Sequence, residues 1–192
     1  MGPEIIIPLI VLAIVVPLGF TWAKRTFKEG GGRTDAEVTA PGGRLTSASL
    51  RDLPSPPWRV VYEIANDKLG GVEHVAIGPP GAFAIETSMA PMPAPPTDEP
   101  DAHAVAMAAI TRGELDDALR RCAMTSAGLL RVHWGPNDEG REAVDVLPGT
   151  TAVAGRSLVE WAGGLPTELS DAQIELAWQT VTTAIGRPDP LA

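Results

Sequence analysis

Two glutamates and one serine are the residues whose types and spacing could do chemistry. Glu73 and Glu86 lie at the ends of two short apolar runs, GVEHVAIG and AFAIETS, which the turn sequence PPG separates. These are the places where a metal-dependent nuclease would carry its carboxylates. Such a site would also carry a lysine after the second carboxylate, and this chain has Ser88 there. The stretch is therefore an active site, a changed one, or a fold kept for another purpose.

Other residue types that build catalytic or cofactor sites are sparse. His74, His103 and His133 lack the clustered spacing of metal ligands, so we expect each to be an ordinary strand or helix residue. Cys122 is the only cysteine, which excludes an internal disulfide and a CxxC metal pair and agrees with a reducing compartment. No serine lies in a GxSxG context, and no haem, iron–sulfur or copper ligand set is visible. We therefore expect no cofactor.

The elements that position these residues follow from the pattern of the chain. The content of β-branched and aromatic residues predicts three successive strands, then an Ala-rich helix that Gly113 breaks or bends, further strands, and two final helices. The predicted strands are 58–66, 71–78, 82–88, 129–134, 142–147 and 150–154, and the predicted helices are 101–126, 155–165 and 169–186. Ser170 is a suitable N-cap for the last helix, and Gly186 a suitable end. This order predicts an α/β domain with a mixed sheet.

The N-terminal segment has the composition of a membrane anchor. Residues 5–23 (IIIPLIVLAIVVPLGFTWA) carry no charge, and as a helix these nineteen residues span about 28 Å, close to the thickness of a bilayer's hydrocarbon core. A cleaved signal peptide would begin with basic residues, whereas Glu4 precedes this run. A buried helix with no polar face would need a larger protein around it. We therefore expect one transmembrane helix in contact with the lipid bilayer.

The flanks of this segment predict its orientation. Lys24, Arg25 and Lys28 all follow the apolar run, and Trp22 fits the interfacial belt. The positive-inside rule therefore places the N-terminus outside the plasma membrane and the rest of the chain in the cytoplasm. We divide the chain into an anchor (1–28), a Gly-rich polar linker (29–57), one α/β domain (58–186) and a tail (187–192).

Charge limits the partners. The chain carries a net charge of −9, and its first 32 residues carry three basic and two acidic residues, so the remainder carries about −10. A domain of that sign is repelled by nucleic acid and by anionic lipid unless it has a concentrated basic patch. No run rich in Lys or Arg follows Lys28. We therefore expect no nucleic-acid partner, while the apolar helix favours integral membrane subunits as partners.

The run VEHVAIGPPGAFAIETS resembles the core motif of the nuclease-related domain (NERD) family, which has the restriction-endonuclease-like fold. That motif has an acidic residue and a histidine at a strand start, a G-P-x-G turn, a second apolar strand, and then an acidic residue, any residue and lysine. The later segments VAG, RSLVEW and LPTELSDAQI also resemble the family. The resemblance covers residues 58–186 and implies a restriction-endonuclease-like domain.

Matched residue by residue, Glu73 stands where the family has its first metal-binding aspartate and Glu86 where it has the second carboxylate. Both are hard oxygen ligands suited to Mg²⁺. Ser88 occupies the lysine position, and a short neutral serine cannot orient the attacking water or stabilise charge on phosphate. The helical glutamate that the family often places before the first strand has only upstream candidates here, namely Asp35, Glu37 and Asp52. Lys68, in the turn before Glu73, is the candidate for a relocated lysine.

Three functions compete. The missing lysine and the negative charge favour a non-catalytic accessory subunit of a larger membrane complex. The layout and the composition, rich in Ala, Gly, Pro and Arg as in a high-GC bacterium, are similar to the small accessory subunits of the actinobacterial respiratory supercomplex of cytochrome bcc and terminal oxidase. The alternatives are a membrane-tethered Mg²⁺-dependent nuclease that uses Lys68, and an adaptor whose acidic surface recruits a basic soluble partner.

Overall fold

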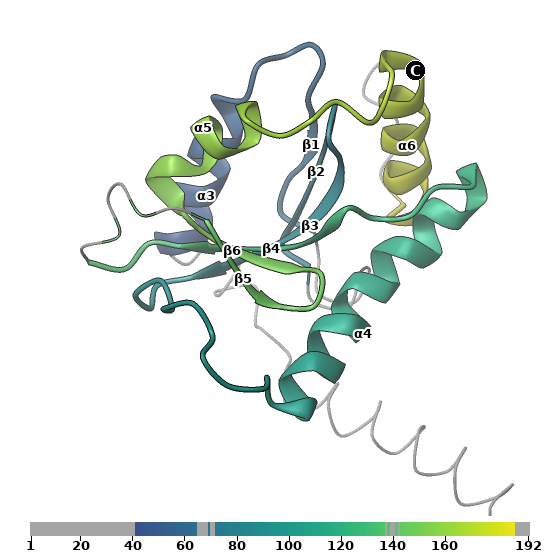
Figure 1. Ribbon diagram of the computed structural model, residues 1–192. Helices are drawn as coiled ribbons and strands as arrows, with labels where there is room; N and C mark the ends of the chain where they lie inside the picture. Colours follow the sequence, from purple (N-terminus) through teal and green to yellow (C-terminus); the bar gives the residue numbers. More distant parts are fainter. Residues whose placement is uncertain are drawn as a thin grey trace, which may run out of the picture. The chain divides into compact units, whose positions relative to one another are not determined.

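A six-stranded mixed sheet lies between two layers of helices in the computed structural model (Figure 1). The structure describes residues 41–64, 69, 72–136, 138, 141 and 143–186. The predicted span 5–23, its flanking residues and the tail 187–192 lie outside these residues. Within the part of the chain that is described, no helix is both long and apolar enough to cross a membrane.

The sheet has the strand order β1-β2-β3-β4-β6-β5. β1 to β3 form an antiparallel meander, β3, β4 and β6 run parallel to one another, and β5 closes the edge antiparallel to β6. The α/β class and the mixed sheet are as predicted. The strands are β1 (Arg59–Val61), β2 (His74–Gly78), β3 (Gly81–Ser88), β4 (Gly128–His133), β5 (Val144–Leu147) and β6 (Thr150–Ala154).

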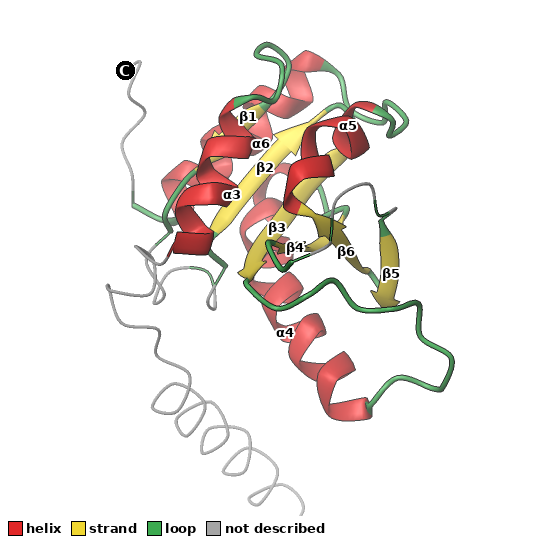
Figure 2. Cartoon of the chain, turned by 90° about the vertical axis from the view of Figure 1, so that its left-hand side faces the viewer, coloured by secondary structure: helices red, strands yellow, loops and turns green. Residues whose placement is uncertain are grey.

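The helices cover the two faces in pairs (Figure 2). The helices α3 (Pro41–Arg51) and α5 (Leu158–Gly163) pack on one face, and α4 (Ala102–Leu119) and α6 (Asp171–Ala184) pack on the other. Short 3₁₀ turns follow α4 (η1, Arg120–Cys122) and precede α5 (η2, Gly155–Ser157). All residues of β2 are buried, as expected for a strand that is covered on both faces.

Alternation along the strands divides the apolar residues into two cores. In β3, Ala84 belongs to the core under α4 and α6, and Ile85 to the core under α3 and α5. In β4, Leu129 and Leu130 divide in the same way. Glu86 follows the same alternation, so it lies on the face that α4 and α6 cover, at the point where the apolar residues of β3 end.

The helix ends agree with their sequence signals. The side chain of Asp101 accepts a hydrogen bond from the backbone N–H of Ala104 at 2.9 Å and caps α4. Ser170 and Gln173 form a capping box at the start of α6, which confirms the predicted N-cap. Gly186 has a φ of 72°, the left-handed conformation that ends a helix.

Three predictions about the elements need correction. The segment predicted as a linker contains α3, whose Leu50 lies in a core; most of its buried residues are Gly, Ser and Thr, so its apolar face was not apparent. The first strand ends at Val61, because Glu63 has a φ of 51°, which an extended strand cannot contain. Gly113 does not interrupt α4, which continues to Leu119.

Candidate functional site

Glu86 is paired with an arginine from the next strand. β3 and β4 run parallel in a register that sets Glu86 beside Arg131. The Nη2 and Nε atoms of Arg131 donate to Oε2 of Glu86 at 3.1 and 3.3 Å. Both side chains are largely covered, with 21% of Glu86 and 36% of Arg131 exposed. The carboxylate that the motif assigns to a metal ion is therefore held by a guanidinium group.

Glu73 lies just before β2, and the backbone brings it close to the same place. Its N–H donates to the carbonyl of Ile85 at 3.0 Å, and its own carbonyl accepts from the N–H of Ile64 at 2.9 Å. Only 7% of Glu73 is exposed. The structure thus places the two predicted carboxylates at neighbouring strand ends, as the motif requires, but with Glu73 buried and Glu86 ion-paired.

Ser88 ends β3 and takes part in a backbone turn. Its Oγ accepts a hydrogen bond from the N–H of Ala90 at 3.2 Å, and its carbonyl accepts from the N–H of Trp134 at 2.8 Å. The register sets Ser88 beside His133 of β4. A serine in this position starts the next loop and supplies no positive charge to Glu86.

None of the remaining predicted site residues is seen to contact Glu73 or Glu86 among the described residues. Lys68, the candidate for a relocated lysine, lies outside the described residues, as do Trp22, Lys24, Arg25 and Lys28. Among the upstream acidic candidates, Asp52 is exposed and follows the end of α3, and α3 itself contains no Asp or Glu. Within the described part of the chain, no group of three or more His, Cys, Asp or Glu side chains is placed to hold a metal ion.

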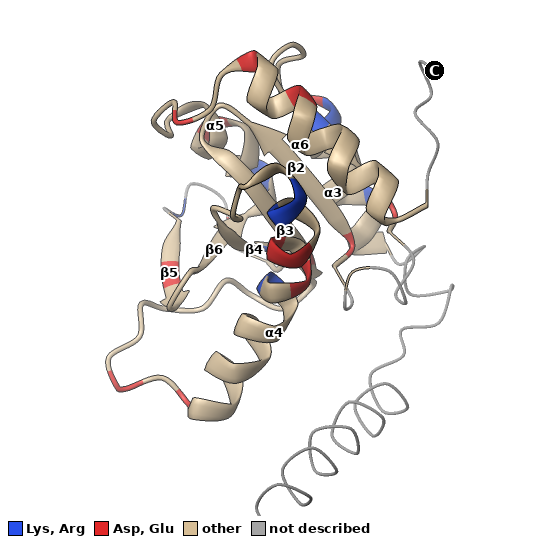
Figure 3. Ribbon diagram, turned by 90° about the vertical axis from the view of Figure 1, so that its right-hand side faces the viewer, with Lys and Arg blue, Asp and Glu red and all other residues tan. Residues whose placement is uncertain are grey.

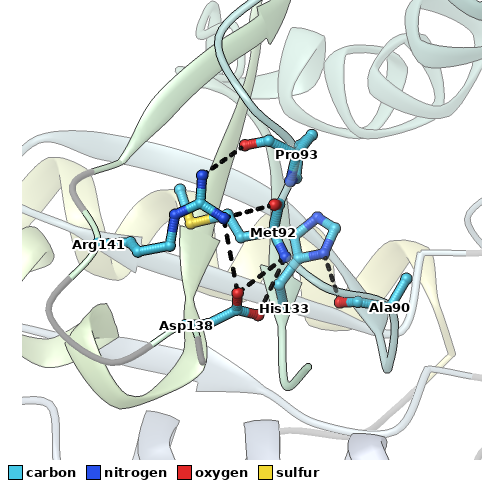
Figure 4. A network of polar contacts seen from close by, with 6 residues as sticks. All are labelled: Ala90, Met92, Pro93, His133, Asp138 and Arg141. Carbon is cyan, nitrogen blue, oxygen red and sulfur yellow. Dashed lines mark hydrogen bonds and ion pairs between the residues drawn. The ribbon is translucent and has the colours of Figure 1, made fainter. Parts of the chain in front are cut away.

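The segment after β3 is tied down over the end of β4 by a network of polar contacts (Figure 4). Both carboxylate oxygens of Asp138 accept from the N–H of Met92 at 3.0 Å. The Nη1 of Arg141 donates to the carbonyl of Met92 at 2.7 Å and lies 3.8 Å from the Asp138 carboxylate. The Nδ1 of His133 donates to the carbonyl of Ala90 at 3.1 Å.

This network gives three polar residues, His133, Asp138 and Arg141, a structural role. Asp138 is only 5% exposed, and the side chain of Met92 is buried against β6. The carboxyl ends of the parallel strands are the usual place for a ligand in an open α/β sheet. Here the backbone from Ala90 to Pro93 covers the end of β4. The network therefore stabilises a segment that covers this end of the sheet.

His74 is buried on the opposite face, under α3. Its Nδ1 accepts from the N–H of Glu63 at 3.1 Å, so the neutral ring carries its proton on Nε2. Burial lowers the pKa of His74 to about 4, which a hydrogen bond to the backbone of Gly43 partly opposes. This histidine is therefore neutral at physiological pH and supports the packing of α3 on the sheet.

A cavity of about 440 Å³ opens at another place, beside the edge strand β5. Its lining is mostly prolines, glycines and aliphatic residues, and its one carboxylate, Asp145, accepts a hydrogen bond from Thr151 at 2.7 Å. None of Glu73, Glu86 and Ser88 lines this cavity. It therefore adds no substrate pocket to the predicted site.

Together these contacts do not fit the Mg²⁺ site that the resemblance implies. A metal ion at Glu86 would compete with the Arg131 guanidinium, which holds Oε2, and α3 offers no acidic ligand. Arg131 was missed from the sequence, although the signal was present: LLRVH is an apolar strand with one arginine, and a buried arginine needs an acidic partner. Asp138 and Arg141 carried no such signal, because they lie in a turn.

Comparison with known proteins adds no further assignment. Neither a protein-family model, nor a curated protein, nor a solved structure matches the chain.

Proposed function

We propose that this chain is a non-catalytic, single-pass accessory subunit of a larger membrane complex. Residues 5–23 form its anchor, and its α/β domain lies on the cytoplasmic side of the plasma membrane. The proposal has two parts, which rest on different features: the chemistry of the domain and the composition of the N-terminal segment.

The ion pair between Glu86 and Arg131 supports the first part. A nuclease of the type that the sequence resembles needs a free carboxylate for its metal ion and a cation aimed at the phosphate. Here the one cation beside Glu86 among the described residues lies against that carboxylate at 3.1 Å, and Ser88 stands at the lysine position. Both groups are used within the protein, which favours a retained scaffold over an enzyme.

The apolar segment supports the second part. Pro8 and Pro17 interrupt a charge-free run, and such prolines need neighbouring helices to satisfy the backbone groups that they free. Those neighbours are helices of other subunits, because the sequence contains no second apolar run of this length. The layout and composition favour the actinobacterial respiratory supercomplex of cytochrome bcc and terminal oxidase as the complex in question.

Affinity purification tests this proposal. The full chain, tagged at its C-terminus, is expressed in its own host, solubilised gently and purified, and the eluate is analysed by mass spectrometry and by its haem absorption. We expect integral membrane subunits in a fixed ratio to the tagged chain, with the haem spectrum of the respiratory complex.

The matched control keeps residues 24–192 and replaces the span with an unrelated transmembrane helix. This control should lose partners that only the span recruits and keep any partner that the domain also binds. The proposal is refuted if the wild-type chain elutes as a free monomer, and the respiratory assignment is refuted if the eluate holds a membrane complex without haem.

A further inference from the structure

The first half of α4 is an apolar helix with little to cover it. Residues 102–110 (AHAVAMAAI) contain no charged residue, and Ala108 is the only one of them that is buried. Apart from Ala108, the buried residues of α4 lie in its second half, at Thr111, Leu115, Ala118 and Leu119. Ile110 is 52% exposed. Except for His103, the residues of this segment are apolar. A helix that is apolar on nearly all sides is normally buried, so this half has the composition of a helix with a partner.

Acidic residues lie at both ends of this apolar segment (Figure 3). Asp98, Glu99 and Asp101 precede it, and Glu114, Asp116 and Asp117 follow it. Arg112 is the only basic residue between positions 98 and 117, and its Nη1 is directed to the carbonyl of Pro148. At the second end, however, Asp117 pairs with Arg120, and Asp116 accepts a hydrogen bond from the N–H of Ser126. Asp98 and Glu99 therefore make the first end the more strongly acidic of the two. We refer to the apolar residues 102–110 together with these two acidic ends as the α4 surface.

The charges of the α4 surface favour one class of binding partner over the others. A second copy of this chain would bring the same acidic ends to the contact, and an anionic lipid surface would be repelled in the same way. A protein segment with an apolar middle and Lys or Arg at both ends would bury Ile110 and its neighbours and place its cations opposite the two acidic ends.

We propose that the α4 surface binds such a segment in a cytoplasmic loop of a membrane subunit. This inference rests on the proposed function, because cytoplasmic loops carry an excess of Lys and Arg close to their spans. The span at residues 5–23 would then hold the chain in the complex, and the α4 surface would orient the domain against the positively charged face of its partner.

Site-specific photo-crosslinking in the full chain tests this proposal. A photoreactive benzoyl-phenylalanine is placed at position 110 and, as a matched control, at position 176. Leu176 is 49% exposed on α6, and several polar residues of that helix surround it. After irradiation of intact cells, the cross-linked peptides are identified by mass spectrometry.

We expect several-fold more adduct at position 110 than at position 176. The adducts should be peptides of a cytoplasmic loop that have apolar residues between Lys or Arg residues. Substitution of Asp98→Asn together with Glu99→Gln should lower the yield at position 110. Equal yields at the two positions, adducts with lipid or with a second copy, or acidic peptides would each overturn the proposal.

Ile110→Glu provides a second measurement that does not depend on cross-linking. The side chain is exposed, so the free energy of unfolding should stay within about 0.5 kcal/mol of that of the wild type. In a background with the span replaced, Ile110→Glu should reduce co-purification of the membrane subunit at least tenfold, and Leu176→Glu should not. Equal retention of the subunit by both variants would refute the α4 surface.

Failure of this inference is distinguishable from failure of the proposed function. If the wild-type chain co-purifies with a membrane complex but position 110 gives no specific adduct, the α4 surface is wrong and the accessory role stands. If position 110 gives a basic peptide of a soluble protein, the assignment of the α4 surface to a membrane subunit is refuted, and co-purification of the wild-type chain decides the accessory role separately.

Discussion

Glu86 shows how a small change at the residue level alters what a site can do. The resemblance would make Glu86 a metal ligand, but the neighbouring parallel strand contributes Arg131 in register with it. A guanidinium group presents several donors in a fixed plane and binds a carboxylate oxygen through two of them. The pair therefore stabilises the packing of β3 against β4 and neutralises a largely buried charge.

A double-mutant cycle measures this pair. Arg131→Met leaves the Glu86 carboxylate without its cation, so we expect the free energy of unfolding to fall by about 1–2 kcal/mol. Glu86→Gln should lower it by a similar amount, and the double variant should cost less than the sum, with a coupling of about 1 kcal/mol. Denaturant unfolding of the full chain in detergent measures each value, and strictly additive costs would show that the pair is not formed.

The stability of the protein should depend on pH through His74. Its pKa in the folded state is about 4, whereas an unfolded histidine titrates near its ordinary value of 6.5. As the pH falls from about 6.5 to about 4, the unfolded state takes up a proton that the folded state excludes. This difference should remove about 3 kcal/mol of stability, all of which is present above that range.

His74→Asn is the control for that measurement. The Asn side-chain oxygen can accept the Glu63 N–H in place of Nδ1, but it does not titrate. Unfolding measured between pH 4 and pH 8 should therefore show a shallower decline in this variant. The same slope in both proteins would mean that other groups cause the acid sensitivity.

At the scale of elements, two indole rings lie on glycines of the sheet. A Cβ atom at Gly78 would lie 2.3 Å from the ring of Trp58, and one at Gly155 would lie 2.2 Å from the ring of Trp134. These glycines allow the aromatic side chains to pack flat against the backbone at the ends of β2 and β6. Neither position has a positive φ, so the requirement for glycine is steric.

Gly78→Ala and Gly113→Ala form a matched pair that tests this requirement. Gly78→Ala should lower the free energy of unfolding by about 2 kcal/mol, because Trp58 must move. Gly113 lies within α4 with no atom within 4 Å of an added Cβ, so alanine should raise stability there by about 0.5–1 kcal/mol. Thermal unfolding gives both values, and a neutral Gly78→Ala would contradict the packing of Trp58.

The elements that sequence reasoning found are those with strong local signals. The strands β2, β3, β4 and β6 are apolar runs, and α6 has both a capping box and a terminal glycine. The helix α3 lies in a segment that was assigned to the linker, because small polar residues, and not large apolar ones, form its buried face. The buried position of Met92 has no local signal, because its contacts come from Asp138 and Arg141, which are far from it in the sequence.

The same distinction applies to the candidate site. The motif predicted the neighbouring positions of Glu73 and Glu86, because both lie at the ends of sequential strands. The pair between Glu86 and Arg131 depends on a parallel register across an intervening helix, which local patterns do not specify. The ion pairing of Glu86 could therefore be found only from the tertiary structure.

At the scale of the whole molecule, charge and apolar surface are separated. The acidic domain contains one helix half, residues 102–110, that is free of charge, and the apolar run at residues 5–23 is followed by the basic residues Lys24, Arg25 and Lys28. In the described part of the domain, Glu86 is held in an ion pair and the end of β4 is covered by the segment after β3. We therefore infer that its contribution to a complex is made through its surfaces.

The most direct test of this account is a cleavage assay on the purified full chain. Single- and double-stranded DNA and RNA are incubated with Mg²⁺ and with Mn²⁺, and the Glu73→Gln, Glu86→Gln double variant, purified in the same way, controls for contaminating nucleases. We predict that the wild type cleaves none of them faster than this control, and that Ser88→Lys alone restores no activity because Arg131 still holds Glu86. Metal-dependent cleavage by the wild type that the double variant lacks would contradict the account.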